Sequence, residues 1–175
     1  MVKEGIKVAT NLLRQITKRW STFEAAAPYR SDYFRNHFLA INALKERKEP
    51  YLQAIAEAEE ARLTRIYPYA YSPIDPNLKL KPDVIESPLL DKRLYSKNLN
   101  EVLDALMDAV FTYITYPKRI QEYSILGDKK RNPHFIAYEK EAKTVWQQWV
   151  KAIKDGNTKE AARLSNELLR YTWGK

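Results

Sequence analysis

The stretch KEGIKVATNLLRQITKRWSTF, residues 3–23, decides the fold class of this chain. Its apolar residues recur at alternating steps of three and four, which is the spacing of one face of an α-helix. A neighbouring row at the same steps carries Lys7, Arg14 and Lys18. One face of the predicted helix can therefore be buried while the adjacent face meets a polyanion. The apolar row consists of Ile6, Ala9, Leu13, Ile16, Trp20 and Phe23.

Proline, glycine and capping residues set the bounds of the helices. Pro28 ends the first helix near Ala27, because the residue before a proline is driven out of the α region. Pro50 and Pro133 suit first helical positions, and Pro117 is expected to end a helix. Asp155-Gly156 closes the fifth helix, and Asn157 with Glu160 forms a capping box for the last. The predicted helices cover about residues 3–26, 31–48, 50–67, 98–116, 133–154 and 157–173, and the second and third could form one element kinked at Pro50.

The remaining long segment is rich in proline, with five prolines among residues 68–88. Such a density excludes a helix, so residues 68–97 are predicted to form an extended loop. No strand pattern of useful length and no internal repeat is present. The sequence therefore predicts an all-α protein: a bundle of about four helices in residues 50–175, preceded by a basic helical arm in residues 1–49.

The composition narrows the class of protein. The chain has 175 residues, enough for one domain with a real core, and contains no cysteine, which excludes disulfides and thiolate metal sites. No run approaches eighteen apolar residues, and Lys3, Glu4 and Lys7 interrupt the N-terminus, so we expect intracellular synthesis. The net charge is +8; residues 1–50 hold ten Lys/Arg against five Asp/Glu, and residues 117–175 hold thirteen against seven.

Motifs for catalysis are missing from the sequence. The two histidines, His37 and His134, are far apart, and there is no glycine-rich phosphate loop. Glu59 belongs to an acidic run that is interpreted as a solvated face, and Asp104 with Asp108 as a pair of surface carboxylates. We therefore expect no enzyme activity, no cofactor and no metal.

Positive charge and aromatic side chains remain as the candidate chemistry. Cations that reach phosphates release counterions from a duplex, so the basic segment is a candidate DNA-binding surface. A solvated helix face is the simpler interpretation of any single cation, and Trp146 and Trp149 favour core packing over base stacking. A basic helix with Trp20 and Phe23 would also suit an anionic membrane surface. The candidate DNA-binding residues are Lys3, Lys7, Arg14, Lys18, Arg19, Arg30, Arg35, Lys45, Arg47 and Lys48.

The layout resembles the major coat proteins of filamentous archaeal viruses, the lipothrixvirus group. The resemblance rests on the basic helical segment Asn11–Trp20 and on a break at Ala27-Pro28-Tyr29-Arg30. It continues in a Tyr/Pro-rich middle and a helical C-terminal half without cysteine. It covers the chain in layout and contains no diagnostic motif.

The resemblance implies a structural role in a virion. Proteins of that group have a C-terminal helical bundle and an N-terminal helical arm that wraps linear double-stranded DNA, held in A-form. Two paralogous coat proteins pair, many pairs stack into a helical filament, and some members carry a lipid envelope. Transferred to this chain, the resemblance implies a nucleocapsid protein made in the host cytoplasm, with the ten cations above facing DNA. A chromatin-like or regulatory DNA-binding protein that does not polymerise, and a membrane-surface scaffold, are the alternatives.

Overall fold

A computed structural model describes residues 2–20, 41–66, 91–126 and 133–173, and every regular element in these ranges is helical. The prediction of an all-α protein is therefore confirmed for the described residues. The elements are α1 (Val2–Trp20), α3 (Pro50–Ile66), the 3₁₀ helix η2 (Lys92–Tyr95), α4 (Leu99–Leu126), α5 (Pro133–Lys154), α6 (Thr158–Leu169) and the 3₁₀ helix η3 (Arg170–Trp173).

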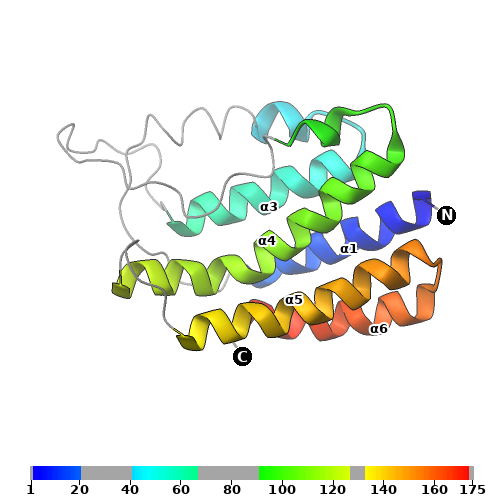
Figure 1. The fold of residues 1–175 in the computed structure, drawn as a ribbon. Coiled ribbons are helices and arrows are strands. Elements are labelled where there is room, and N and C mark those ends of the chain that lie inside the picture. The colour runs from blue at the N-terminus through cyan, green and yellow to red at the C-terminus, as the bar shows by residue number, and fades with distance from the viewer. Residues whose placement is uncertain (1, 21–40, 67–90, 127–132, 174–175) are drawn as a thin grey trace.

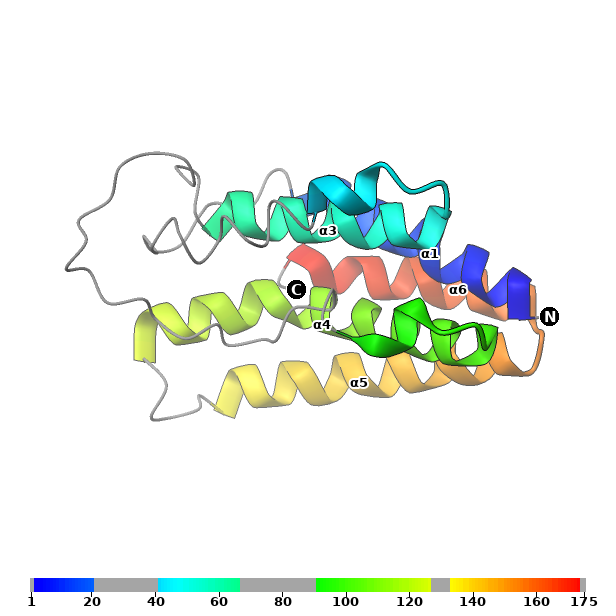
Figure 2. The same cartoon turned by 90° about the horizontal axis from the view of Figure 1, so that it is seen from above.

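The long helices lie roughly side by side, with α4 between α3 and α5 (Figures 1 and 2). One hydrophobic core joins them and includes buried residues from Ala9 in α1 to Tyr171 in η3. Trp149, Tyr113 and Tyr171 are its largest fully buried side chains. Because all described helices contribute to the same cluster, they share one contiguous core.

Helix α1 packs inside this bundle and contacts α3, α4, α5 and α6. Its residues Ala9, Leu12, Leu13 and Ile16 are no more than 1% exposed. This differs from the prediction that residues 1–49 form an arm separate from the bundle. The wide apolar face of α1 needs a partner surface, and α3 and α4 of the same chain supply it.

Several predicted helix bounds agree with the structure. Helices α3 and α5 begin at Pro50 and Pro133, and Lys154 is the last residue of α5. Gly156 adopts a φ of 73°, the left-handed conformation that ends helices. The structure favours two separate helices over the alternative of one element kinked at Pro50, because residues 46–49 separate the helical residues 41–45 from α3.

Two bounds were predicted wrongly. Helix α4 continues through Pro117 to Leu126, and it changes direction along its length (Figure 1). A proline removes one i to i−4 hydrogen bond, which a long helix tolerates by bending. The segment assigned to an extended loop contains η2, where Asp91 caps the helix by accepting from the Arg93 amide and Leu94 is buried. The rest of that segment, residues 68–90, lies outside the described residues.

Candidate nucleic-acid interface

The outward face of α1 carries four of the candidate cations. Lys3, Lys7 and Lys18 are exposed and Arg14 is half-buried, on the side of the helix opposite Leu12 and Ile16. Asn11 and Gln15 are exposed among them, and Glu4 is the one exposed acid of α1. The structure therefore keeps the polar row that the sequence predicted and points it away from the core. This set, Lys3, Lys7, Arg14 and Lys18, is called the α1 row below.

Two acidic residues of α3 pair with candidate cations, one of them in the α1 row. The Arg14 Nε atom lies 3.9 Å from a carboxyl oxygen of Glu57, and both side chains are about two-fifths exposed. Lys45 forms an ion pair with Glu60 at a similar exposure. Surface pairs of this kind contribute about 0–1 kcal/mol, so a phosphate can replace the carboxylate as partner at little cost. The local sequence contains no signal for these partners, because each pair joins different helical segments.

Arg47 and Lys48 follow the helical residues 41–45 and are both exposed. The Arg47 guanidinium donates two hydrogen bonds to the Glu49 carboxylate, at 3.1 and 2.9 Å. This bidentate contact raises the pKa of Arg47 and lowers the pKa of Glu49, since each group favours the charged form of the other. Arg47 is thus partly neutralised, whereas Lys48 forms no ion pair with the described residues.

The structure does not describe the side chains of three candidate cations. Arg30 and Arg35 lie outside the described residues, and for Arg19 only the helical backbone is described. The structure therefore brings Lys3, Lys7, Arg14 and Lys18 together on one helix face. Lys45, Arg47 and Lys48 lie on a separate segment that leads into α3.

Asp104 and Asp108, two carboxylates on one face of α4, each lie close to a basic side chain. Asp108 accepts from the Arg93 guanidinium at 2.7 Å, and Asp104 lies 3.7 Å from the Lys154 amino group. Both remain surface carboxylates, as predicted. Arg93 also contacts Asp91, whose pKa it lowers through that hydrogen bond, and so joins η2 to α4.

Glu59 was predicted wrongly as part of a solvated face. Its side chain is fully buried and its Oε1 atom accepts a 2.6 Å hydrogen bond from the Tyr113 hydroxyl. The position lies on the same helical row as Leu52 and Ile55, which is the signal for burial in the sequence. Its neighbours Glu57 and Glu60 are half-buried and pair with cations, so the acidic run divides between the core and the surface.

The tryptophans of α5 serve packing, as the sequence favoured. Trp149 is fully buried, and its indole N–H donates to the Ser165 hydroxyl of α6 at 2.9 Å. Trp146 is half-buried, donates to the Met107 carbonyl of α4 at 2.7 Å and packs against Phe111 with ring centroids 5.4 Å apart. Neither indole is presented for stacking on a base.

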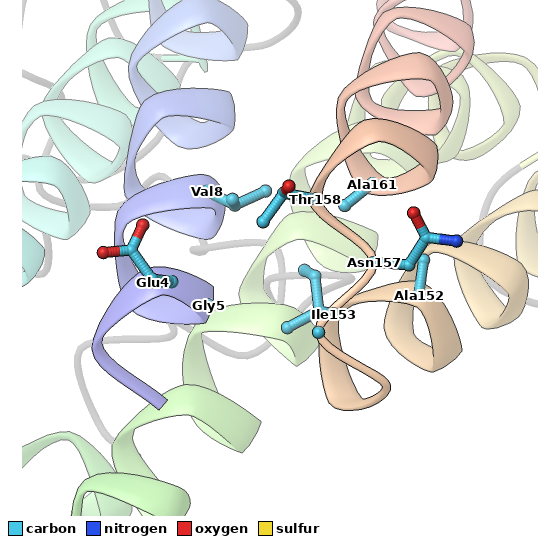
Figure 3. A pocket seen from close by; sticks show the side chains of 9 residues that line it. Glu4, Gly5, Val8, Ala152, Ile153, Asn157, Thr158 and Ala161 are labelled. Carbon is cyan, nitrogen blue, oxygen red and sulfur yellow. The ribbon is translucent and has the colours of Figure 1, made fainter. Parts of the chain in front are cut away.

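A small pocket lies between the start of α1 and the turn that joins α5 to α6 (Figure 3). Its volume is about 80 Å³, well below the roughly 300–1,000 Å³ of small-molecule sites. Val8, Ile153 and Ala161 line it, while the side chains of Glu4 and Asn157 point away from its centre (Figure 3). It offers no convergent polar groups to orient a substrate.

Metal-binding and membrane-spanning features are also absent from the described residues. No group of three or more His, Asp or Glu side chains there is arranged to hold a metal ion. His37 lies outside those residues. None of the described helices has the length and apolar content needed to cross a membrane.

Comparisons of the chain with protein-family models, with curated proteins and with solved structures find no match in any of the three.

Proposed function

We propose that this chain is a structural coat protein that binds linear double-stranded DNA without sequence specificity and polymerises into a helical filamentous nucleocapsid. The observation that carries the proposal is the α1 row. Its four cations project from the side of α1 opposite the buried core residues. No catalysis, cofactor or metal is part of the proposal.

The dimensions of the α1 row suit a duplex backbone. From Lys3 to Lys18 the helix rises about 22 Å, at about 1.5 Å for each residue. A duplex carries one negative charge for about every 1.7 Å of its axis, both strands counted, so about thirteen phosphate charges lie along this length of duplex against four cations on the row. Phosphates are therefore in excess over the cations of the row.

Binding without sequence preference follows from the same contacts. Cations and amides that donate to phosphate oxygens fix position on the duplex and carry no base information. The amide side chains of Asn11 and Gln15 lie between the cations and add donors of this kind. A coat must cover a whole genome, so uniform affinity is an advantage.

Other features of the proposal come from the resemblance alone. They are pairing with a paralogous coat protein, DNA in A-form, location in the virion after synthesis in the host cytoplasm, and, as in some members of the group, a surrounding lipid envelope. The wrapping of DNA by an N-terminal arm is also of this kind. It would require α1 to leave the surface formed by α3 and α4.

The membrane-surface alternative is disfavoured by the packing of α1. An interfacial helix inserts its apolar face into lipid. In this structure Leu12, Leu13 and Ile16 face the bundle core instead. Among the residues whose side chains the structure describes, Tyr95, at 52%, is the one large hydrophobic residue that is exposed.

Electron microscopy of negatively stained protein, with and without linear duplex DNA at low salt, tests the proposal. Filaments of constant width that form only with DNA are expected. Discrete protein–DNA particles would favour the non-polymerising alternative. Absence of any association with DNA would reject both, and binding to anionic liposomes would then support the membrane alternative.

Substitutions in the α1 row test the site itself. Deleting residues 1–30 would remove Leu12, Leu13 and Ile16 from the core, so charge removal is the sharper test. Replacing Lys3 and Lys7 by Gln is expected to weaken duplex binding and to reduce the log–log salt slope by about 0.9 for each phosphate that the protein no longer neutralises. The matched control replaces Lys92 and Lys97, which are exposed and lie on neither α1 nor α5. Equal effects of the two double substitutions would reject the assignment.

A further inference from the structure

A second basic row runs along the outward face of α5. Lys140, Lys143, Lys151 and Lys154 are all exposed, with Gln147 exposed between them. At about 100° for each residue, these positions fall on the side of α5 opposite Tyr138, Ala142 and Trp149, which are buried. The four lysines, called the α5 row below, span about 21 Å of helix. They were not among the cations predicted from the sequence to bind DNA.

Only two lysines of the α5 row form ion pairs with described residues, and both pairs are exposed. Lys151 contacts Asp155 at 2.6 Å and Lys154 lies 3.7 Å from Asp104, with the two lysine side chains 78% and 58% exposed. Lys140 and Lys143 form no ion pair with the described part of the chain. Exposed pairs of this kind contribute about 0–1 kcal/mol, so all four ammonium groups are open to exchange for an external anion.

The α1 row and the α5 row lie on different sides of the bundle. Figure 2 shows α3 along one edge and α5 along the other, with α4 between them, while α1 runs from beside α3 to the turn that joins α5 to α6. Each row also points directly away from the core that the two helices share. Because the rows point in different directions, a single straight duplex cannot lie along the full length of both rows of one molecule.

We propose that the α5 row is a second polyanion-binding face that takes a second segment of nucleic-acid duplex, so that one protein molecule bridges two segments. The fit is to the phosphate backbone, since four ammonium groups over about 21 Å face a dense line of phosphate charges. The amide of Gln147 and the hydroxyl of Thr144, both exposed, add neutral donors to phosphate. The inference rests on the proposed DNA-binding function of the α1 row.

A lipid surface fits the α5 row less well than a duplex. Interfacial helices combine cations with large apolar side chains that insert among the acyl chains. The exposed positions of α5 are lysines, small residues such as Ala137, polar residues such as Thr144, and one acid, Glu141, which accepts a hydrogen bond from Tyr171. An ionic face without apolar anchors favours phosphates held in a rigid duplex.

The test measures bridging separately from binding. Two duplexes of the same sequence, one labelled with a donor fluorophore and one with an acceptor, are mixed with the full chain at low salt. Energy transfer between them reports bridging, and anisotropy of one duplex alone reports binding. Three matched variants each have two exposed lysines replaced by Gln: Lys140 with Lys143, Lys3 with Lys7, and Lys92 with Lys97 as the control.

The α5 variant is expected to raise the protein concentration for half-maximal bridging at least tenfold. Its affinity for one duplex should stay within about threefold, and the salt slope of the bridging step should fall by about 0.9 for each phosphate that the variant no longer neutralises. The control variant should match the unmodified chain in both measurements. Thermal melts and sedimentation without DNA confirm that the variants share one fold and one oligomeric state.

Three results would overturn the inference. The first is a lack of energy transfer with the unmodified chain, and the second is equal bridging by the α5 and control variants. The third is loss of binding to phosphatidylserine vesicles in the α5 variant while bridging is unchanged, which would assign the face to lipid. Bridging without filaments would reject the coat proposal alone, and filaments without bridging would reject this inference alone.

Discussion

The hydroxyl of Tyr113 on α4 donates a hydrogen bond of 2.6 Å to a carboxyl oxygen of Glu59 on α3, and both side chains are fully buried. Removing the Tyr113 hydroxyl leaves this buried oxygen of Glu59 without its hydrogen-bond donor, and such a loss lowers stability by about 1–3 kcal/mol. We therefore expect Tyr113→Phe to lower the free energy of unfolding by that amount in urea titrations. Tyr95→Phe, at an exposed position, is the control and should stay within about 0.5 kcal/mol. Equal values for the two variants would contradict this role for the hydrogen bond.

Gly5 allows α1 to approach its neighbours closely. A Cβ atom at this position would lie 2.8 Å from Ile153 Cγ2 and 3.0 Å from Leu103 Cδ2. Alanine improves helix propensity by about 1 kcal/mol, but overpacking of a core costs about 1–3 kcal/mol. Gly5→Ala should therefore lower the melting temperature, whereas Asn11→Ala, on the exposed face of α1, should not. A rise in melting temperature with Gly5→Ala would show that the helices move apart freely.

The structure explains why some elements could be predicted from the sequence and others could not. Pro50, Pro133 and Gly156 act through their own backbone geometry, so their positions alone fix helix bounds. Helix α4 continues through Pro117 because helical turns on both sides of the proline hold it in place. Rules that consider only the residues next to the proline cannot predict this.

Tertiary partners account for the remaining errors at the candidate site. The sequence shows that α1 has an apolar face but not which surface covers it, so an arm and a bundle helix have the same local pattern. The burial of Glu59 was not predicted because glutamate is usually exposed. Its position on the same helical row as Leu52 and Ile55 was the better guide. The outward position of the α1 row could be predicted because exposure follows directly from helical spacing.

Asn157 caps α6 by accepting a hydrogen bond from the Glu160 amide at 3.2 Å. In a capping box the Glu160 carboxylate would accept a hydrogen bond from the Asn157 amide. In this structure that carboxylate pairs with Arg163 instead. Loss of an N-cap side chain costs about 1 kcal/mol. Asn157→Ala should lower the free energy of unfolding by about that amount, and Asn166→Ala, within α6, serves as control. Identical unfolding curves would show that the cap is dispensable.

Alkaline pH should destabilise the fold through Tyr138 and Tyr171. Burial raises the pKa of both phenols, and the pKa of Tyr171 reaches about 12. Because an unfolded tyrosine titrates near pH 10, the stabilisation is complete below about pH 10 and is lost as the pH rises towards 12. Urea unfolding at several pH values measures this loss.

Tyr171→Phe removes one of these two groups while keeping the ring that packs edge-on against Tyr138 at 5.5 Å. It also removes the 2.9 Å hydrogen bond from the Tyr171 hydroxyl to Glu141, which costs about 1 kcal/mol at neutral pH. The variant should then lose less stability than the unmodified chain between about pH 10 and 12. A parallel decline in both proteins would contradict the assignment.

The two acids of α3 that pair with candidate cations should weaken DNA binding if the proposed function holds. Glu57 and Glu60 compete with phosphate for Arg14 and Lys45. Replacing both by Gln is expected to tighten duplex binding several-fold at low salt, with a smaller gain at high salt where charges are screened. Fluorescence anisotropy measures the affinity, and Glu101→Gln, at an exposed position on α4, gives the effect of removing one carboxylate that pairs with neither cation. Weaker binding by the double variant would oppose the proposal.

The close approach of Gly5 to Ile153 joins two residues near opposite ends of the chain. A ribosome adds about 5–20 residues each second, so α1 waits on the order of ten seconds for α5 to be made. During synthesis the apolar face of α1 therefore lacks part of its final cover, while its cations are already present. A nascent or truncated chain that ends before α5 offers this uncovered helix to chaperones, to other copies and to cellular polyanions. The time between the synthesis of α1 and the synthesis of α5 therefore sets how long the apolar face of α1 stays incompletely covered.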